Sequence, residues 1–288
     1  MKPSILVQLD TDPQPSVFDA VVAVDAGVDH LFRHGGVTPG NVRDLVYGAL
    51  FTRGPADLHR TALFIGGSDV AAGEAVLEAV KATFFAAFRV SVLLDANGAN
   101  TTAAAAVLAA LEGAGGNLQG VPTAVLAATG PVGQRVARLL GRLGATVAVG
   151  SRSLDRARTT ADSLQQATGS SYSPFATGSL DDLARGLAGA QVVVAAGAAG
   201  VTLLPDSVRQ KLPDLKVAID LNAVPPLGIE GVKSGDKGVE RNGLKVWGAL
   251  GVGGTKMKIH KKAVQTLFTA NDKVLDAEDV LELGRTLD

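Results

Sequence analysis

The sequence predicts an α/β protein of two domains, each a mainly parallel β-sheet with flanking helices. In the first hundred residues, apolar runs typical of strands alternate with segments of helical periodicity. Such alternation favours a parallel sheet covered by helices. A second series begins near residue 120 with a strand, a turn of small residues and a helix. That opening is typical of a Rossmann-like nucleotide-binding domain.

The first domain is predicted from three strand-like runs and the helical patterns that follow them. Strands are expected at residues 5–9, 61–65 and 89–94, and helices at 17–24, 71–85 and 101–111. Gly113-Ala-Gly-Gly-Asn117 then breaks the pattern, as glycine clusters do between elements. We therefore place a domain boundary there.

The second domain is expected to continue the alternation. It has predicted strands at 146–150, 192–196, 216–220 and 245–247, and a helix at 155–167 followed by a polar loop at 168–173. The segment after Lys256 is predicted to be helical and to return to the first domain. The expected division is 1–113 plus 256–288 for a substrate-binding domain and 114–255 for a nucleotide-binding domain.

Composition predicts a cytoplasmic enzyme without a metal. The net charge of −1 gives no basic field for nucleic acid or an anionic membrane. The absence of cysteine excludes disulfides and thiolate ligands, and the four histidines lack metal-ligand spacing. The first ten residues predict a strand rather than a signal peptide, and no apolar run is long enough to span a membrane.

The turn after the strand near residue 123 is the first candidate site. Ala128-x-Gly130-x-x-Gly133 stands where a dinucleotide fingerprint usually has three glycines. Small residues let the backbone approach a pyrophosphate, and the helix N-terminus provides N–H donors and positive potential. The alternative is a tight turn that binds nothing.

The end of the next strand indicates which nucleotide would bind. Ser151-Arg152-Ser153 occupies the position where an acidic residue would grip a ribose 2′-hydroxyl. A guanidinium between two hydroxyls suits a 2′-phosphate instead, because arginine offers a fork of donors to phosphate oxygens. The sequence therefore favours NADP over NAD, unless Arg152 is only a solvated loop residue.

Four polar or glycine-rich clusters fall at predicted strand ends, and each also has a structural explanation. Asp69, Asn100 or Thr101 could cap helices, Phe18 could belong to the core, and Lys256 could be a solvated charge. The glycines before Lys256 argue for bare backbone placed against a neighbour. The clusters span residues 8–19, 66–69, 95–102 and 248–260.

Both domains contain long motifs, which together extend over essentially the whole chain. They are Gln8-x-Asp10-Thr-Asp12-x-x-Pro15-Ser-Val-Phe-Asp19, Asp29-His30, Val37-Thr-Pro, Thr52-Arg-Gly54, Asp95-x-Asn97-Gly-x-Asn100-Thr-Thr, Asn222-Ala-x-Pro225-Pro-Leu-Gly-Ile229 and Trp247-Gly-Ala-Leu-Gly-x-Gly-Gly-x-Lys256-x-Lys-x-His260. In these motifs the chain resembles the NAD(P)-dependent methylene-tetrahydromethanopterin dehydrogenases of methylotrophic and related bacteria.

This resemblance implies hydride transfer from the methylene bridge of a tetrahydromethanopterin-type pterin to NADP⁺, with NAD⁺ as a weaker acceptor. It implies that pterin and nicotinamide meet between the domains of a homo-oligomeric enzyme. The residues carried over are Asp19 and Lys256 as catalytic, Phe18, Asn97 and Thr102 as substrate-binding, and Gly130, Pro131, Val132, Gly133, Ser151, Arg152 and Ser153 as cofactor-binding. Ala128 and Ser151-Arg-Ser153 depart from the family pattern, which leaves the NADP/NAD preference open.

Other functions remain open at this stage. A methylene-tetrahydrofolate dehydrogenase would act on the same reacting bridge, and shikimate- or glutamyl-tRNA-reductase-like oxidoreductases have similar nucleotide domains. A sensor that binds NADP(H) without turnover would not need the polar clusters of the first domain.

Overall fold

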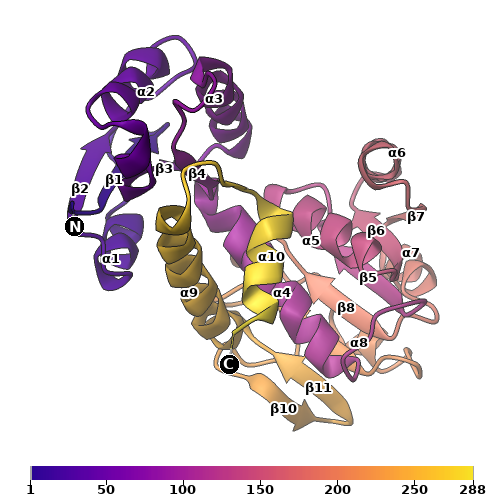
Figure 1. Ribbon diagram of the computed structural model, residues 1–288. Helices are drawn as coiled ribbons and strands as arrows, with labels where there is room; N and C mark the ends of the chain where they lie inside the picture. Colours follow the sequence, from indigo (N-terminus) through magenta and orange to yellow (C-terminus); the bar gives the residue numbers. More distant parts are fainter. Residues whose placement is uncertain (1, 288) are drawn as a thin grey trace. The chain divides into compact units, whose positions relative to one another are not determined.

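The computed structural model describes residues 2–287, which form two compact units (Figure 1). We call residues up to Thr101 together with those from Met257 onward the N-terminal unit, and Thr102–Lys256 the central unit. Each unit contains one largely parallel sheet with helices packed on it, so the predicted fold class is confirmed. Among the described residues, no helix is long and apolar enough to cross a membrane.

The sheet of the N-terminal unit is parallel throughout, in the order β12-β4-β3-β1-β2. Its inner strands β3 and β4 are buried along their whole length, as expected of parallel strands covered on both faces. The strands are β1 (Ile5–Asp10), β2 (His30–His34), β3 (Thr61–Gly66), β4 (Ser91–Leu94) and β12 (Val274–Leu275).

Side chains of this sheet alternate between two helical layers. Phe64 on β3 stacks on His260 of α9, with ring centroids 5.5 Å apart, and Gln8 and Asp10 of β1 share that face. Ile5, Val7 and Thr61 point to the other face, where α2 lies beside α3 (Figure 1). The helices are α1 (Val17–Asp25), α2 (Val42–Phe51), η1 (Pro55–Arg60), α3 (Val70–Thr83), η2 (Ala96–Gly98), η3 (Leu267–Thr269) and α10 (Ala277–Arg285).

The sheet of the central unit has seven strands in the order β10-β11-β9-β8-β5-β6-β7. Only β10 and β11 are antiparallel to each other, and the other neighbours are parallel. The strands are β5 (Pro122–Leu126), β6 (Thr146–Ser151), β7 (Tyr172–Ala176), β8 (Val192–Ala195), β9 (Val217–Asp220), β10 (Lys237–Arg241) and β11 (Leu244–Trp247). The helices within this unit are α5 (Pro131–Arg142), α6 (Leu154–Thr168), α7 (Leu180–Gly186) and α8 (Asp206–Arg209).

Two further helices, α4 (Ala99–Gly113) and α9 (Ala249–Thr266), have residues in both units. The glycine-rich segment before Lys256 was expected to be bare backbone against a neighbour, and it forms the first turns of α9. Gly251 does meet such a neighbour, because a Cβ there would clash with the carbonyl oxygen of Asp236. A Cβ on Gly253 or on Gly254 would have no atom within 4 Å.

Several elements differ from the sequence-based expectation. The polar loop predicted at 168–173 ends earlier than expected, because β7 begins at Tyr172. The Tyr172 ring is buried, and its hydroxyl lies 3.1 Å from that of Thr168. The last segment is not wholly helical, since β12 pairs with β4 through Val274 and Leu275. The strand β2 and the helix α2 were not predicted.

Candidate functional site

The candidate nucleotide site begins at the turn between β5 and α5. Ala127 takes a left-handed conformation (φ 55°), and the amide of Ala128 donates to the carbonyl oxygen of Gly150 on the neighbouring strand. Gly130 is the N-cap of α5, and Pro131 fills the first helical position, where the missing N–H costs nothing. The turn thus presents the N-terminus of α5 at the carboxyl end of the sheet, where nucleotide phosphates bind in such folds.

Gly133 holds the helix against this turn. A Cβ on Gly133 would lie 2.7 Å from the carbonyl oxygen of Ala127 and 2.8 Å from the Cα of Ala128. Both distances are shorter than van der Waals contact, so only glycine allows this close approach. The third fingerprint glycine therefore has the packing role that the motif gives it, although the first is replaced by Ala128.

Replacing Gly133 with Ala should lower stability and weaken NADP⁺ and NAD⁺ binding to similar extents. The added methyl group must push α5 away from the turn, which costs about 1–3 kcal/mol, or roughly 2–12 °C in melting temperature. Thermal unfolding and nucleotide titration measure the two effects. Gly130→Ala is the matched control, because a Cβ there has the Ala127 oxygen at an ordinary 3.6 Å. Equal melting temperatures for the two variants would contradict this role.

A pocket of about 480 Å³ lies beside the turn, with the side chains expected to hold the 2′-phosphate along one wall. Ser151 ends β6 and is buried, while Arg152 and Ser153 are exposed. Ser153 is the N-cap of α6 and accepts a hydrogen bond from the amide of Arg156. The lining consists of Ala127, Thr129, Ser151, Arg152, Ser153, Arg156, Thr177, Gly197, Ala198, Val201 and Leu203.

Arg156 is a pocket residue that the sequence analysis missed. It lies in the first turn of α6, four residues after Arg152, and both arginines line the same pocket. A cation at a helix N-terminus opposes the helix dipole, so a stabilising role in the helix itself is disfavoured. The neighbouring carboxylate of Asp155 pairs with Arg158 instead, at 3.3 Å. Two arginines beside a helix N-terminus form surroundings that suit a phosphate group.

A second group of polar residues lies at the carboxyl ends of the strands in the N-terminal unit. The buried Asp10 carboxylate accepts hydrogen bonds from the amides of Asp12 (3.0 Å) and Ser16 (2.9 Å). Asp12 in turn accepts from the amide and the hydroxyl of Ser68, at 2.9 and 2.8 Å. These bonds fix the loop that leads into α1, and so they position the side chains of its first turn.

Asp19 and Phe18 lie in that first turn of α1. The amide of Asp19 donates to the Ser16 hydroxyl, which caps the helix. The Asp19 carboxylate is half-buried, and one of its oxygens is 3.6 Å from the point where a Cβ on Gly66 would lie. Asp10 has an oxygen 3.2 Å from the same point, so two carboxylates flank the end of β3. Phe18 is 52% exposed, so its alternative interpretation as a core residue is wrong.

Asn97 is held in the turn that follows β4. Its backbone is left-handed (φ 54°), its amide donates to the carbonyl oxygen of Gly67 at 2.6 Å, and its side chain is exposed. The buried Asp95 carboxylate accepts from the amides of Asn100 and Thr101 and from the Thr101 hydroxyl. Asn100 and Thr101 therefore fix the start of α4, whereas the side chain of Asn97 is exposed to solvent.

The remaining candidate residues lie on or at the start of three helices, α4, α9 and α3. Thr102 lies in the first turn of α4 and Lys256 lies within α9, and both side chains are half-buried. Asp69 caps α3 by accepting from the amide of Ala72, so its alternative structural role is confirmed. His260 is 1% exposed against Phe64, which makes it a core residue rather than a surface histidine.

Asp220 organises the loop that carries the Asn222–Ile229 motif. At the end of β9 its carboxylate accepts from the amides of Asn222 and Ile229, each at 3.0 Å. Burial raises the pKa of this carboxyl, and hydrogen bonds from the backbone of Asn222, Ile229 and Gly228 oppose that rise. A Cβ on Gly228 would lie 2.5 Å from the carboxylate, so the loop fits closely around it.

Comparison with known proteins supports the assignment of these motifs. The family model described as methylene-tetrahydromethanopterin dehydrogenase, N-terminal, matches residues 17–97. The bifunctional protein MdtA of Methylorubrum extorquens is 45% identical over 287 residues, covering 100% of both chains. The NAD(P)-dependent methylenetetrahydromethanopterin dehydrogenase of the same organism is 32% identical, covering 99% of this chain and 98% of its own.

Among solved structures, the chain is similar to quinate dehydrogenase from Corynebacterium glutamicum in complex with NAD. The TM-score is 0.53, with 16% identity, 99% of this chain covered and 100% of the other. At that identity the likeness concerns the fold alone. The two full-length relatives carry the family assignment, and it agrees with the motifs identified in the sequence. The chain belongs to the methylenetetrahydromethanopterin dehydrogenase family of enzymes.

Proposed function

We propose that this protein oxidises the methylene bridge of methylene-tetrahydromethanopterin to the methenyl form, with NADP⁺ as the acceptor. The observation that carries the proposal is the pocket beside β6, which both Arg152 and Arg156 line, next to the turn that leads into α5. It is supported by membership of the dehydrogenase family and by the polar residues held at the strand ends of the N-terminal unit.

Two groups of residues would bind different parts of the cofactor. Gly130, Pro131, Val132 and Gly133 would place the start of α5 against the pyrophosphate, and the backbone N–H groups of Val132 and Gly133 would be the donors. Ser151, Arg152 and Ser153 would hold the 2′-phosphate, with Arg156 as a second guanidinium. The bound nicotinamide would supply the hydride acceptor. NAD⁺ lacks the 2′-phosphate and would bind more weakly.

The residues near the substrate would stabilise charge and orient the pterin, and none of them would need to transfer a proton. A methylene carbon between two nitrogens that loses hydride becomes a cation shared by those nitrogens, so no general base is required. The half-buried carboxylate of Asp19 would stabilise that developing charge. Lys256 would orient the substrate by binding a carbonyl or carboxylate oxygen away from the forming cation. Phe18, Asn97 and Thr102 would complete the pterin contacts.

Appearance of the reduced-nicotinamide absorbance, with methylene-charged pterin as substrate, tests this proposal. Turnover with NADP⁺ supports it, and binding of NADP(H) without turnover would favour a sensor instead. A second candidate is oxidation of methylene-tetrahydrofolate, because that carrier has the same reacting methylene bridge. A higher kcat/KM with the folate than with the methanopterin would replace the first proposal by the second.

We further propose that copies of the chain associate through α1. Val17, Val21 and Val24 recur at helical spacing on one stripe of this helix and are 68%, 54% and 63% exposed. Such a stripe suits an interface between identical subunits, because water contact with it is unfavourable. Sedimentation velocity should report an oligomer that Val21→Glu dissociates. A monomer in the unaltered protein would reject the proposal.

A further inference from the structure

A second pocket, of about 410 Å³, lies in the N-terminal unit between α2 and the sheet. Its floor is formed by Ile5 and Val7 of β1 and Phe32 of β2, and its roof by Leu45 and Ala49 of α2. This volume is within the range of small-molecule sites. The remaining lining residues are His34, Asp44, Gly48, Thr52, Arg53 and Thr61.

The pocket exists because α2 leaves space above the edge of the sheet. Gly48 is in the middle of the helix, and nothing lies within 4 Å of the point where its Cβ would be. Glycine at a helix interior weakens the helix relative to alanine, so its presence here has no local advantage. The absence of a side chain at this position keeps the space open.

The pocket is on the opposite face of the sheet from the candidate substrate residues. Ile5, Val7 and Thr61 point toward α2, whereas Asp10 points toward the face where Phe64 meets α9. Asp19 has its carboxylate near Asp10 on that second face. A molecule in the pocket would therefore be separated from these carboxylates by the thickness of the sheet.

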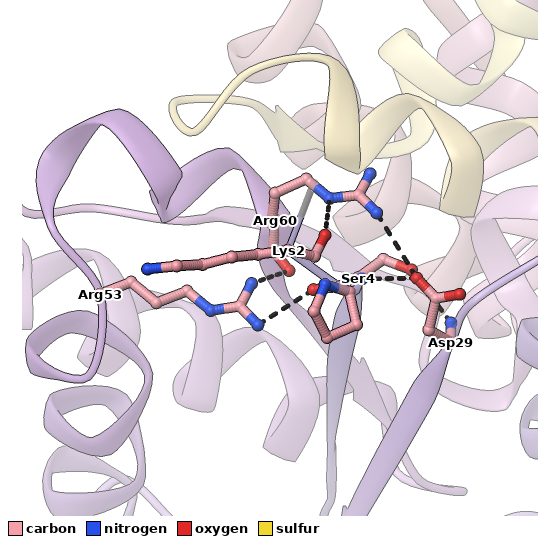
Figure 2. Close-up of polar contacts among 6 residues, drawn as sticks. Lys2, Ser4, Asp29, Arg53 and Arg60 are labelled. Carbon is pink, nitrogen blue, oxygen red and sulfur yellow. Dashed lines mark hydrogen bonds and ion pairs between the residues drawn. The ribbon is translucent and has the colours of Figure 1, made fainter.

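The two ends of the pocket differ in charge. Asp44 lies in the first turn of α2, and Arg53 follows its C-terminus. The guanidinium of Arg53 donates to the carbonyl oxygens of Arg60 (2.6 Å) and Pro3 (2.9 Å), and Figure 2 shows these contacts as dashed lines. A guanidinium has five N–H donors, so these two bonds fix its position and leave donors for a ligand.

Thr61 is a further polar residue in the lining of this pocket. It begins β3, is 3% exposed and lines the pocket, and its hydroxyl has no hydrogen-bond partner among the described residues. A buried hydroxyl without a partner is unfavourable, because it has lost its hydrogen bonds to water. An acceptor group on a molecule in the pocket would give this hydroxyl the partner that it lacks.

We propose that this pocket is a binding site for a small apolar molecule that carries one carboxylate. The apolar body packs between α2 and the floor formed by Ile5, Val7 and Phe32. The carboxylate lies at the end formed by Arg53 and Thr61, away from Asp44. The site is independent of the dehydrogenase function proposed above, since none of its residues belongs to either candidate site.

Calorimetric titration of the full-length protein with 2-naphthoate tests the proposal. We expect one site per chain with a dissociation constant of about 1 mM or below, as is usual for a ligand of this size. Gly48→Leu should abolish binding by filling the space, while Ala75→Leu, on an exposed position of α3, should leave binding unchanged. If Gly48→Leu does not fold, Gly48→Ala should fold and weaken binding.

The charged end is tested with a matched pair of probes. Arg53→Gln should weaken 2-naphthoate about tenfold or more and should leave the neutral 2-naphthylmethanol nearly unchanged. Binding should persist in Arg152→Ala, which excludes the nucleotide pocket as the site. The proposal is overturned if 2-naphthoate fails to bind, if filling Gly48 has no effect, or if both probes respond equally to Arg53→Gln.

Discussion

Arg152→Ala is expected to raise the Michaelis constant for NADP⁺ about ten- to a hundredfold and to leave that for NAD⁺ nearly unchanged. Arg152 lines the pocket at the end of β6, where it would meet the one group that distinguishes the two nucleotides. A charge-assisted hydrogen bond contributes about 1.5–3 kcal/mol, which corresponds to that change in affinity. Initial rates over a range of each nucleotide measure the effect.

The neighbouring arginines supply the controls for this experiment. Arg156→Ala should shift the same preference in the same direction, because its side chain lines the same pocket. Arg158→Ala should leave both Michaelis constants unchanged, since Arg158 pairs with Asp155 at an exposed position on the same helix. Equal losses with NADP⁺ and NAD⁺ in Arg152→Ala would show that the residue supports the fold or the pyrophosphate rather than the 2′-phosphate.

Asp19→Asn is expected to lower kcat about a hundredfold while NADP⁺ binding stays nearly the same. The substitution keeps the shape of the side chain and removes the negative charge that would face the forming cation. Removing one preorganised electrostatic contact from a transition state typically lowers kcat about 10²–10³-fold. Stopped-flow rates at saturating substrates and a separate nucleotide titration distinguish the two quantities.

Asp25→Asn is the matched control on the same helix. Asp25 ends α1 and forms an exposed ion pair with Lys261 at 3.5 Å, so its loss should not change kcat. A raised Michaelis constant for the pterin with unchanged kcat in Asp19→Asn would make Asp19 a binding residue only. A loss as large in Asp25→Asn would point to the stability of α1 instead.

The sequence predicted the buried elements well, because their periodicity is strong. The strands β1, β3 and β5 are nearly continuous apolar runs, as parallel strands covered on both faces must be. The edge strand β2 was missed because its residues, His30-Leu-Phe-Arg-His34, are mostly exposed and lack a simple alternation. The start of α9 was missed because glycines disfavour helix, and the fit of Gly251 against Asp236 appears only in three dimensions.

The candidate site was predictable where a motif fixes position and unpredictable where folding brings residues together. Ser151 and Arg152 follow from the rule for strand ends in nucleotide-binding domains. Arg156 has no such rule, and only its placement on the first turn of α6 brings it into the pocket. The sequence placed Asp10 only within the polar cluster 8–19, whereas in the structure its hydrogen bonds to Asp12 and Ser16 fix the segment that carries Asp19.

The pairing of β12 with β4 has a consequence for synthesis on the ribosome. Val274 pairs with Val92, and the Ser91 hydroxyl donates to the carbonyl oxygen of Ala270, so contacts join residues about 180 positions apart. This sheet cannot be completed before residues 274 and 275 have been synthesised, whereas Thr102–Lys256 is continuous in sequence and precedes them. The nascent chain is therefore expected to complete the sheet of the central unit before that of the N-terminal unit, whose earlier strands lack β12 until then.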